Sequence, residues 1–205
     1  MRLYLSSSEL GNRPERLVSL AGYGAHVALI MNALDNFPDE REQCYGTGKQ
    51  ALEALGFSVE ELDLRKCIGE PDRLAQALEG KGLLWVNGGN TFLLRRAMSL
   101  SGFDAIVREL LAADRLVYAG FSAGVCCATP SLRGIEFLDE LPPEPMWEGL
   151  TLIDYHVAVH YRPGSPDIQP IQRTVRYYRE HAMPYVALRD GEVLVVEENQ
   201  TELVR

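Results

Sequence analysis

Residues 116–124 read Leu-Val-Tyr-Ala-Gly-Phe-Ser-Ala-Gly, an apolar run that ends with a serine between two glycines. The run 116–120 has the length and composition of a strand covered on both faces. The small residues after it allow a sharp turn into a helix, with a serine hydroxyl exposed at the turn. We therefore predict that Ser122 is a nucleophile on a strand–turn–helix unit. The alternative is an ordinary turn in which Ser122 caps the following helix.

Strand-like and helix-like stretches alternate on both sides of this unit. Strands are predicted at residues 3–6, 26–32, 57–64, 83–87, 152–160, 185–188 and 192–196. Helices are predicted at residues 15–22, 38–55, 71–78, 92–100, 103–113 and 168–181. The proline-rich stretch 131–150 is predicted to be irregular, and Asp190-Gly191 to form a hairpin turn between the last two strands. The alternation predicts an α/β fold, a three-layer αβα sandwich around a mainly parallel sheet, as one domain over residues 1–205.

The composition indicates an ordinary globular enzyme. The 29 acidic and 20 basic residues give a net charge of −9, which argues against a nucleic acid or an anionic membrane as partner. No run reaches the ~18 apolar residues of a membrane span, and the apolar N-terminal stretch is too short for a secretion signal. The four cysteines lack metal-site spacing and are predicted to be reduced. We predict a cytoplasmic protein with no cofactor and no metal, and leave a homodimer open.

A second glycine-rich turn, residues 88–91, follows another buried-type strand. In a parallel sheet, ligands bind beyond the carboxyl ends of the strands, where both turns fall. The N–H groups of Gly88 and Gly89, together with that of Ala123, could form an oxyanion hole. Asn90 is either a substrate-binding residue or a cap of the next helix.

A serine nucleophile needs a general base, and histidine is the usual one. His26 lies at the amino end of its predicted strand, and His181 at the end of a helix. His156 and His160 share one predicted strand, but only His160 lies at its carboxyl end, where Ser122 emerges. We therefore predict His160 as the base, and a core or surface role for His156.

The acid that orients the histidine is harder to choose. Among the acidic residues between Ser122 and His160, Glu136 is flanked by apolar residues and is predicted to be partly buried. We predict Glu136 as the third member of a triad, and Asp139 is the close alternative.

With these residues assembled, nearly the whole chain resembles the peptidase E family of serine dipeptidases, peptidase family S51. The resemblance rests on residues 88–92, on residues 120–124 and on His160 within Val-His-Tyr. It implies a fold similar to class I glutamine amidotransferases, with Ser122 as nucleophile and His160 as base. The aspartate that serves as acid in the best-known members corresponds to Phe137 here, whereas branches with a glutamate would fit Glu136.

The resemblance also implies a small peptide as substrate. The best-known members remove an N-terminal aspartate from dipeptides, and they hold its carboxylate with an arginine on the helix after the histidine. Arg173 is in that part of the chain, and Arg162 is another candidate for a bidentate carboxylate contact. The alternative for both is a solvated surface arginine.

Three other functions compete with a serine peptidase. An α/β-hydrolase esterase shares the serine turn, but its histidine normally follows the last strand. Cysteine chemistry would have to use Cys126 or Cys127, which lie inside the predicted helix after the turn. A binding module without catalysis could keep the same fold, because a fold alone does not establish activity.

Overall fold

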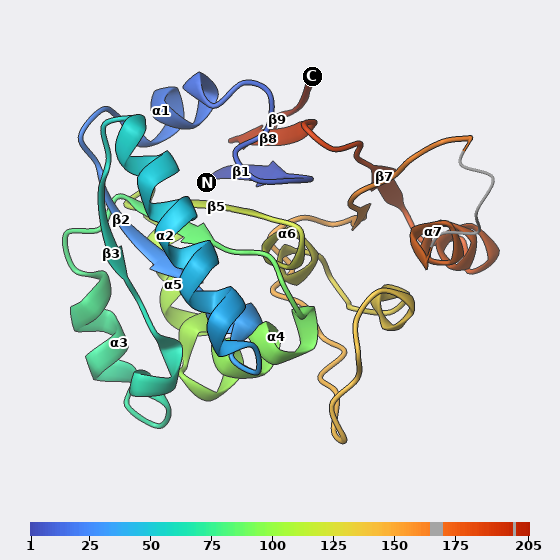
Figure 1. The fold of residues 1–205 in the computed structure, drawn as a ribbon, viewed down its shortest axis with the longest axis horizontal. Helices are drawn as coiled ribbons and strands as arrows, with labels where there is room; N and C mark the ends of the chain where they lie inside the picture. The colour runs from blue at the N-terminus through green and yellow to red at the C-terminus, as the bar shows by residue number, and fades with distance from the viewer. Residues whose placement is uncertain (165–169, 199) are drawn as a thin grey trace.

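A computed structural model describes residues 1–164, 170–198 and 200–205, and within these ranges seven strands form a central sheet in the order β3-β2-β4-β5-β1-β8-β9 (Figure 1). Their bounds are β1 (Arg2–Ser6), β2 (His26–Ile30), β3 (Ser58–Glu61), β4 (Leu83–Val86), β5 (Val117–Phe121), β8 (Val193–Glu197) and β9 (Gln200–Val204). The first five strands pair in parallel, whereas β8 runs antiparallel to β1 and β9. The carboxyl ends of β4, β5 and β1 therefore meet at one edge of the sheet.

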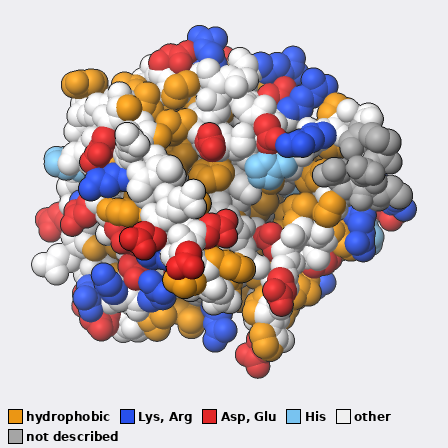
Figure 2. Space-filling view, in the orientation of Figure 1, with side chains coloured by type: hydrophobic (Ala, Val, Ile, Leu, Met, Phe, Trp, Pro, Cys, Tyr) orange, Lys and Arg blue, Asp and Glu red, His pale blue; other side chains and the backbone are white. Residues whose placement is uncertain are grey.

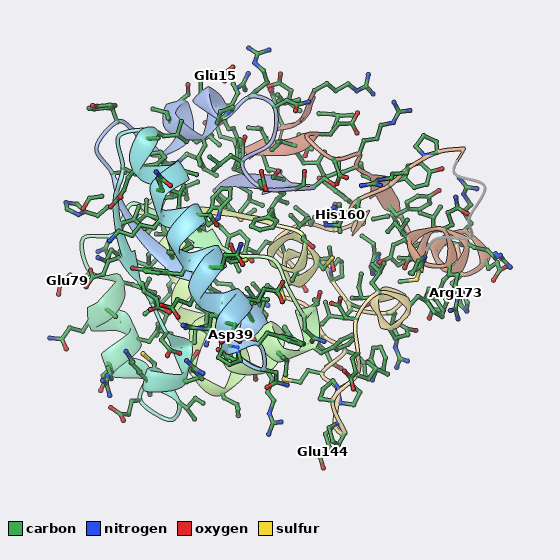
Figure 3. All side chains as sticks on the ribbon, in the orientation of Figure 1. Glu15, Asp39, Glu79, Glu144, His160 and Arg173 are labelled. Atoms are coloured by element: carbon green, nitrogen blue, oxygen red, sulfur yellow. The ribbon has the colours of Figure 1, made fainter. Side chains whose placement is uncertain are left out.

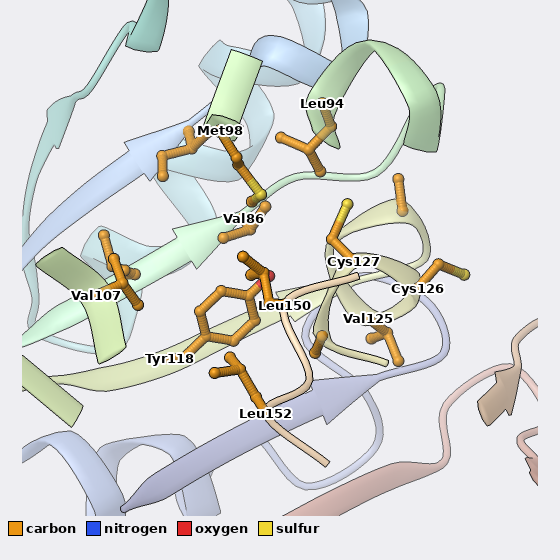
Figure 4. Close-up of a cluster of buried hydrophobic side chains, with 14 of the residues drawn as sticks. Val86, Leu94, Met98, Val107, Tyr118, Val125, Cys126, Cys127, Leu150 and Leu152 are labelled. Atoms are coloured by element: carbon orange, nitrogen blue, oxygen red, sulfur yellow. The ribbon is translucent and has the colours of Figure 1, made fainter. Parts of the chain in front are cut away.

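Both faces of this sheet are buried, because successive side chains of a strand point to opposite sides. In β4, Leu84 and Val86 belong to one hydrophobic cluster, and Leu83 and Trp85 to the cluster on the other face. Figure 4 shows part of the first cluster, where strand side chains meet those of the helices. The continuous apolar runs in the sequence arise from this double burial.

Helices cover the two faces and give three layers. On one side lie α1 (Glu15–Ala21) and α2 (Pro38–Ala54); on the other lie α3 (Pro71–Leu78), α4 (Thr91–Leu100), α5 (Phe103–Ala112) and α6 (Ala123–Ala128). This arrangement confirms the predicted α/β sandwich. Within the described ranges, no helix combines the length and the apolar composition needed to cross a membrane.

A small second sheet pairs β6 (His156–Ala158) with β7 (Tyr185–Ala187) in parallel, beside α7 (Pro170–Glu180) (Figure 1). The predicted strand over 152–160 is therefore much too long. The predicted hairpin at Asp190-Gly191 is wrong, because β7 pairs with β6 whereas β8 pairs with β1 and β9. Tertiary packing decides which strands pair, and a local turn signal does not. The 190–191 turn instead connects the two sheets.

Other differences lie at the edges of the fold. Strand β9 was not predicted because it is an edge strand with four exposed residues of five, and it lacks an apolar run. The predicted start of the last helix, residue 168, lies outside the described residues. Residues 131–150 are irregular, as predicted, apart from the 3₁₀ turn η3 (Ile135–Phe137) and an isolated bridge between Ser131 and Glu148. Further 3₁₀ turns are η1 (Asn32–Leu34) and η2 (Leu64–Cys67).

Candidate active site

Ser122 lies at a sharp turn between β5 and α6. Its backbone angles, φ 50° and ψ −111°, are unfavourable for a residue with a side chain, so the turn is strained. The flanking glycines let the turn pack against β4, since a Cβ on either Gly120 or Gly124 would lie 2.5 Å from the Val86 carbonyl oxygen. The glycine spacing around Ser122 therefore results from close contact with the neighbouring strand.

The Ser122 hydroxyl contacts His160, and the other ring nitrogen of His160 contacts Asp190. Ser122 Oγ lies 3.0 Å from His160 Nε2, and His160 Nδ1 lies 2.6 Å from Asp190 Oδ1. An ionised carboxylate only accepts hydrogen bonds, so we assign the ring proton to Nδ1 and leave Nε2 to accept the Ser122 O–H. These side chains form a Ser–His–Asp arrangement in which the histidine can take the hydroxyl proton.

Two donors hold Asp190 in its ionised form. Partial burial raises the pKa of Asp190, but hydrogen bonds from His160 and Arg162 outweigh burial and lower this pKa below its ordinary value. Arg162 Nη2 lies 3.1 Å from Asp190 Oδ2, so the two carboxylate oxygens have different partners. The His160 side chain remains 43% exposed, and Figure 2 shows a histidine at this surface beside acidic and basic side chains. A ligand can therefore approach the triad from solvent.

The structure does not bring Glu136 to His160. The Glu136 carboxylate accepts a hydrogen bond from the N–H of Gly134 in its own loop. The carboxylate next to His160 is that of Asp190, which the sequence pattern had indicated only as a turn residue. The prediction considered only the segment between the serine and the histidine, whereas the carboxylate that contacts His160 comes from the turn between the two sheets.

Asp139, the alternative acid, lies in the loop after η3, and its carboxylate reaches the start of α4. Its Oδ2 accepts a hydrogen bond from the N–H of Thr91 at 2.7 Å, and burial raises the pKa of Asp139 in spite of this bond. A carboxylate is favourable at a helix N-terminus. In this position Asp139 fixes the start of the helix that follows the second glycine-rich turn.

That glycine pair packs against the Ser122 turn. A Cβ on Gly88 would lie 3.1 Å from Ser122 Cβ. Gly89 has φ +135°, a backbone conformation that residues with a side chain rarely adopt. Among the described residues, none accepts a hydrogen bond from the backbone N–H of Gly88, Gly89 or Ala123. Free N–H groups beside a nucleophile are the groups that can stabilise developing negative charge.

Asn90 acts as a helix cap. Its Oδ1 accepts a hydrogen bond from the Leu93 N–H at 3.0 Å, and its Nδ2 donates one to the Glu140 carbonyl at 2.8 Å. Both ends of the amide are thus engaged within the protein. Of the two roles predicted for Asn90, the capping role is the one that these contacts support.

The two candidate arginines occupy different places. Arg173 lies on α7 with its guanidinium 4.5 Å from the centre of the Phe137 ring, away from His160 (Figure 3). Arg162 lies at the triad, but it is paired with Asp190. The structure therefore separates Arg173 from the Ser122 site and uses Arg162 to hold the acid.

Three consecutive serines, residues 6–8 at the end of β1, contact every segment of the triad. The carbonyl of the first accepts a hydrogen bond from the Ser122 N–H at 3.3 Å, and the hydroxyl of the second accepts one from the His160 N–H at 2.8 Å. The hydroxyl of the third accepts one from the N–H of Gly191, next to the acid, at 3.1 Å. Sequence reasoning treated this run only as the end of a strand.

The middle serine, Ser7, has the most demanding role. It is fully buried, and its hydroxyl also donates to the Leu188 carbonyl at 3.2 Å. His160 has φ 56°, a left-handed conformation that is unfavourable for histidine. The bond to Ser7 therefore helps to hold His160 in the backbone conformation that aims its ring at Ser122.

Cys126 and Cys127, the two candidates for cysteine chemistry, are poor nucleophiles. Cys126 and Cys127 are buried in α6, and burial raises the pKa of both thiols well above the ordinary value, so both stay protonated. In the part of the chain that the structure describes, no three His, Cys, Asp or Glu side chains are grouped as metal ligands.

A cavity of about 700 Å³ opens beside the triad, between α2 and the loop after β1. Asp190 forms part of its wall, together with Phe121, which precedes Ser122, and Asn87, which precedes Gly88. Residues 8–12 and the α2 segment 44–51 supply most of the remaining wall. No local sequence pattern indicates this cavity, because α2 meets the other walls only in the folded chain.

Comparisons with known proteins agree on one family. Residues 5–204 match the model of peptidase family S51. An uncharacterized peptidase of Listeria monocytogenes is 32% identical over 142 residues, which cover 67% of each chain. A probable alpha-aspartyl dipeptidase of Drosophila melanogaster is 31% identical over 160 residues, 74% of this chain and 62% of that one. The crystal structure of a putative peptidase E protein from Listeria monocytogenes has a TM-score of 0.81 at 26% identity, covering 100% of this chain and 98% of that one.

Proposed function

Because the chain belongs to peptidase family S51, we propose that it hydrolyses short peptides through an acyl-enzyme formed on Ser122. His160 Nε2 takes the hydroxyl proton as Ser122 Oγ attacks the scissile carbonyl carbon. The negative charge that develops on the carbonyl oxygen is stabilised by the N–H groups of Gly88, Gly89 and Ala123. His160 then gives its proton to the leaving amine, and a water molecule, activated by the same base, releases the acyl group.

The observation that carries this proposal is the hydrogen-bonded series from Ser122 through His160 to Asp190, with distances of 3.0 and 2.6 Å, on a strained turn. A turn that merely capped α6 would need neither the strain nor an aligned imidazole. The Ser122 side chain in fact makes no capping hydrogen bond to α6. These contacts support a nucleophilic role for the serine.

A more specific form of this proposal is the removal of an N-terminal aspartate from dipeptides, which the alpha-aspartyl dipeptidase among the relatives suggests. That specificity needs a cation to bind the side-chain carboxylate of the substrate. Arg162 is already paired with Asp190, and Arg173 lies against Phe137. We therefore propose hydrolysis of short peptides, and treat aspartyl dipeptides as test substrates rather than as the preferred ones.

The order of the three residues along the chain argues against an α/β-hydrolase esterase. In that fold the acid precedes the histidine, whereas here His160 precedes Asp190. Turnover of p-nitrophenyl esters alone, with no dipeptide hydrolysed, would favour the esterase.

The decisive experiment combines a fluorophosphonate probe with a dipeptide library. Purified protein is expected to be labelled on Ser122, as located by peptide mass spectrometry, and to release free amino acids from several dipeptides. Absence of both labelling and hydrolysis would leave a binding module as the better interpretation. Inactivation by a thiol reagent, with no effect of the phosphonate, would instead favour cysteine chemistry.

The acid side of the pH profile is expected to show a single protonation. The value of kcat/KM should fall about tenfold per pH unit, because protonated His160 cannot accept the Ser122 proton. The pKa of Asp190 is lowered, so this carboxylate stays ionised during the fall and adds no second step. A flat acid limb would contradict His160 as the base, and a twofold steeper limb would contradict a permanently ionised Asp190.

Replacing Ser7 with Ala is expected to lower kcat by about 10- to 100-fold, with KM unchanged within about twofold. The variant removes the acceptor for the His160 N–H, and small displacements of a catalytic group have effects of this size. The matched control is Ser101→Ala, which removes an equally buried hydroxyl that donates to the Met98 carbonyl in α4. Both variants should lose about 1 kcal/mol of unfolding free energy. Equal kcat values in the two variants would show that Ser7 has only a structural role.

A further inference from the structure

The cavity beside the triad has a wall whose charges are all negative. The charged residues that line it are Glu9 and Asp190. No arginine or lysine of the described residues lines it, and the sequence contains none at 165–169 or 199. A substrate carboxylate would find no free counter-ion on this wall, because the nearby Arg162 guanidinium is already paired with Asp190, so its loss of hydration would not be compensated.

Asn87 supplies an unused acceptor on this wall. The residue is only 4% exposed, and its Nδ2 donates to the Gly88 carbonyl at 3.1 Å. Its Oδ1 has no hydrogen-bond partner among the described residues, and Gly48 of α2 is a close neighbour on the same cavity wall. An amide oxygen that lines the cavity and has no protein partner can accept a hydrogen bond from a ligand N–H or O–H group.

Gly48 keeps the cavity open on the side of α2. It lies in the interior of this helix, where glycine is about 1 kcal/mol less favourable than alanine, and its backbone does not have the positive φ that would require glycine. A Cβ on Gly48 would lie 3.9 Å from Asn87 Oδ1, so a longer side chain would project into the cavity. The glycine at position 48 therefore leaves space in the cavity, and its backbone conformation does not require glycine.

From these three observations we infer that the cavity binds a substrate side chain without negative charge, preferentially one with a hydrogen-bond donor, and that Gly48 sets the size it accepts. The inference rests on the proposed peptidase function, because it assigns the cavity to the substrate of Ser122. The rings of Phe121 and Trp85, whose centres lie 6.2 Å apart, add apolar surface for the body of the side chain. The walls thus favour an uncharged polar residue such as asparagine or glutamine over aspartate or glutamate.

The charge preference is tested with two series of dipeptides, Xaa-Ala and Ala-Xaa, in which Asn is compared with Asp and Gln with Glu. These pairs are nearly equal in size and differ in charge. In at least one series, kcat/KM is expected to be tenfold or more higher for the amide. Equal or higher values for Asp and Glu in both series would overturn the inference.

The position of the site is tested with Gly48→Leu and the matched control Gly46→Leu. Both variants remove a glycine from α2, but a Cβ on Gly46 has no atom within 4 Å. Gly48→Leu is expected to lower kcat/KM tenfold or more for Gln in the series that shows the charge preference, and about twofold or less for Ala-Ala. Gly46→Leu should change neither value. An unchanged Gln value in Gly48→Leu would overturn the assignment of the cavity.

Fluorophosphonate labelling separates this inference from the proposed function. Labelling of Ser122 should proceed equally in the wild type and in both glycine variants, because the probe needs only the triad. Labelling and dipeptide hydrolysis without the expected selectivity would refute the cavity assignment and leave the peptidase proposal standing. Absence of Ser122 labelling in the wild-type protein would refute the peptidase proposal itself.

Discussion

Replacing Ser122 with Ala is expected to lower kcat for dipeptide hydrolysis by about 10⁶-fold, the loss that removal of a triad serine causes. The hydroxyl is the attacking group, and among the described residues its only hydrogen bond is the one to His160. The fold should therefore survive the change, and fluorophosphonate labelling should disappear. The measurement is single-turnover and steady-state hydrolysis of the best dipeptide by the purified variant, with circular dichroism to check the fold.

A second serine–histidine pair provides the matched control. Ser131 Oγ lies 3.2 Å from His156 Nε2, and the other ring nitrogen of His156 contacts the Pro184 carbonyl. Among the described residues, no carboxylate bonds to this histidine, and Ser131 does not have the positive φ that strains the turn at Ser122. Ser131→Ala should keep kcat within about threefold of the wild type. Activity of Ser122→Ala within tenfold of the wild type would exclude Ser122 as the nucleophile, and a comparable loss in Ser131→Ala would indicate a general effect on folding.

Ser122 could be identified from the sequence because its constraints are local. The apolar strand before it and the glycines around it are contiguous in the chain, and those glycines are also what the close approach to the Val86 carbonyl requires. The burial of β4 and β5 on both faces can also be recognised locally, because a parallel strand that is covered on both faces has a continuous apolar sequence. These features made both the α/β fold class and the serine turn predictable.

His160 was predicted for a reason that holds only in part. The argument placed it at the carboxyl end of a long strand, but the strand β6 ends at Ala158 and belongs to the small second sheet. His160 reaches Ser122 because its backbone adopts φ 56° and bonds to Ser7, which is 153 positions away in the chain. No local pattern around His160 contains that contact.

The acid could not be predicted because its position depends on pairing between distant strands. Asp190-Gly191 has the sequence of a hairpin turn, and a hairpin between β7 and β8 would not by itself place Asp190 beside His160. In the folded chain β7 pairs with β6 and β8 pairs with β1, so this turn connects the two sheets. The pairing of these strands therefore determines that the Asp190 carboxylate lies next to His160.

Replacing Asp190 with Asn is therefore expected to lower kcat by about 10⁴-fold, whereas Glu136→Gln should change it by less than about threefold. An amide can donate a hydrogen bond to His160 Nδ1, which favours the tautomer with the proton on Nε2, and that nitrogen then cannot accept the Ser122 proton. The change also removes the negative charge that stabilises the imidazolium. Glu136 contacts the N–H of Gly134, so its loss affects only its own loop.

Both substitutions replace a carboxylate with an amide, but we expect a large loss of kcat in Asp190→Asn and a small one in Glu136→Gln. The measurement is kcat at the pH of maximal activity for both variants, together with the rate of fluorophosphonate labelling, which should fall with kcat in Asp190→Asn. A large loss in Glu136→Gln with little loss in Asp190→Asn would show that the acid lies between the serine and the histidine after all. Equal and small losses would mean that the 2.6 Å contact between Asp190 and His160 does not orient the base. Because Arg162 also binds Asp190, Arg162→Gln serves as an intermediate case: it leaves the carboxylate on His160 and should lower kcat far less than loss of the carboxylate itself.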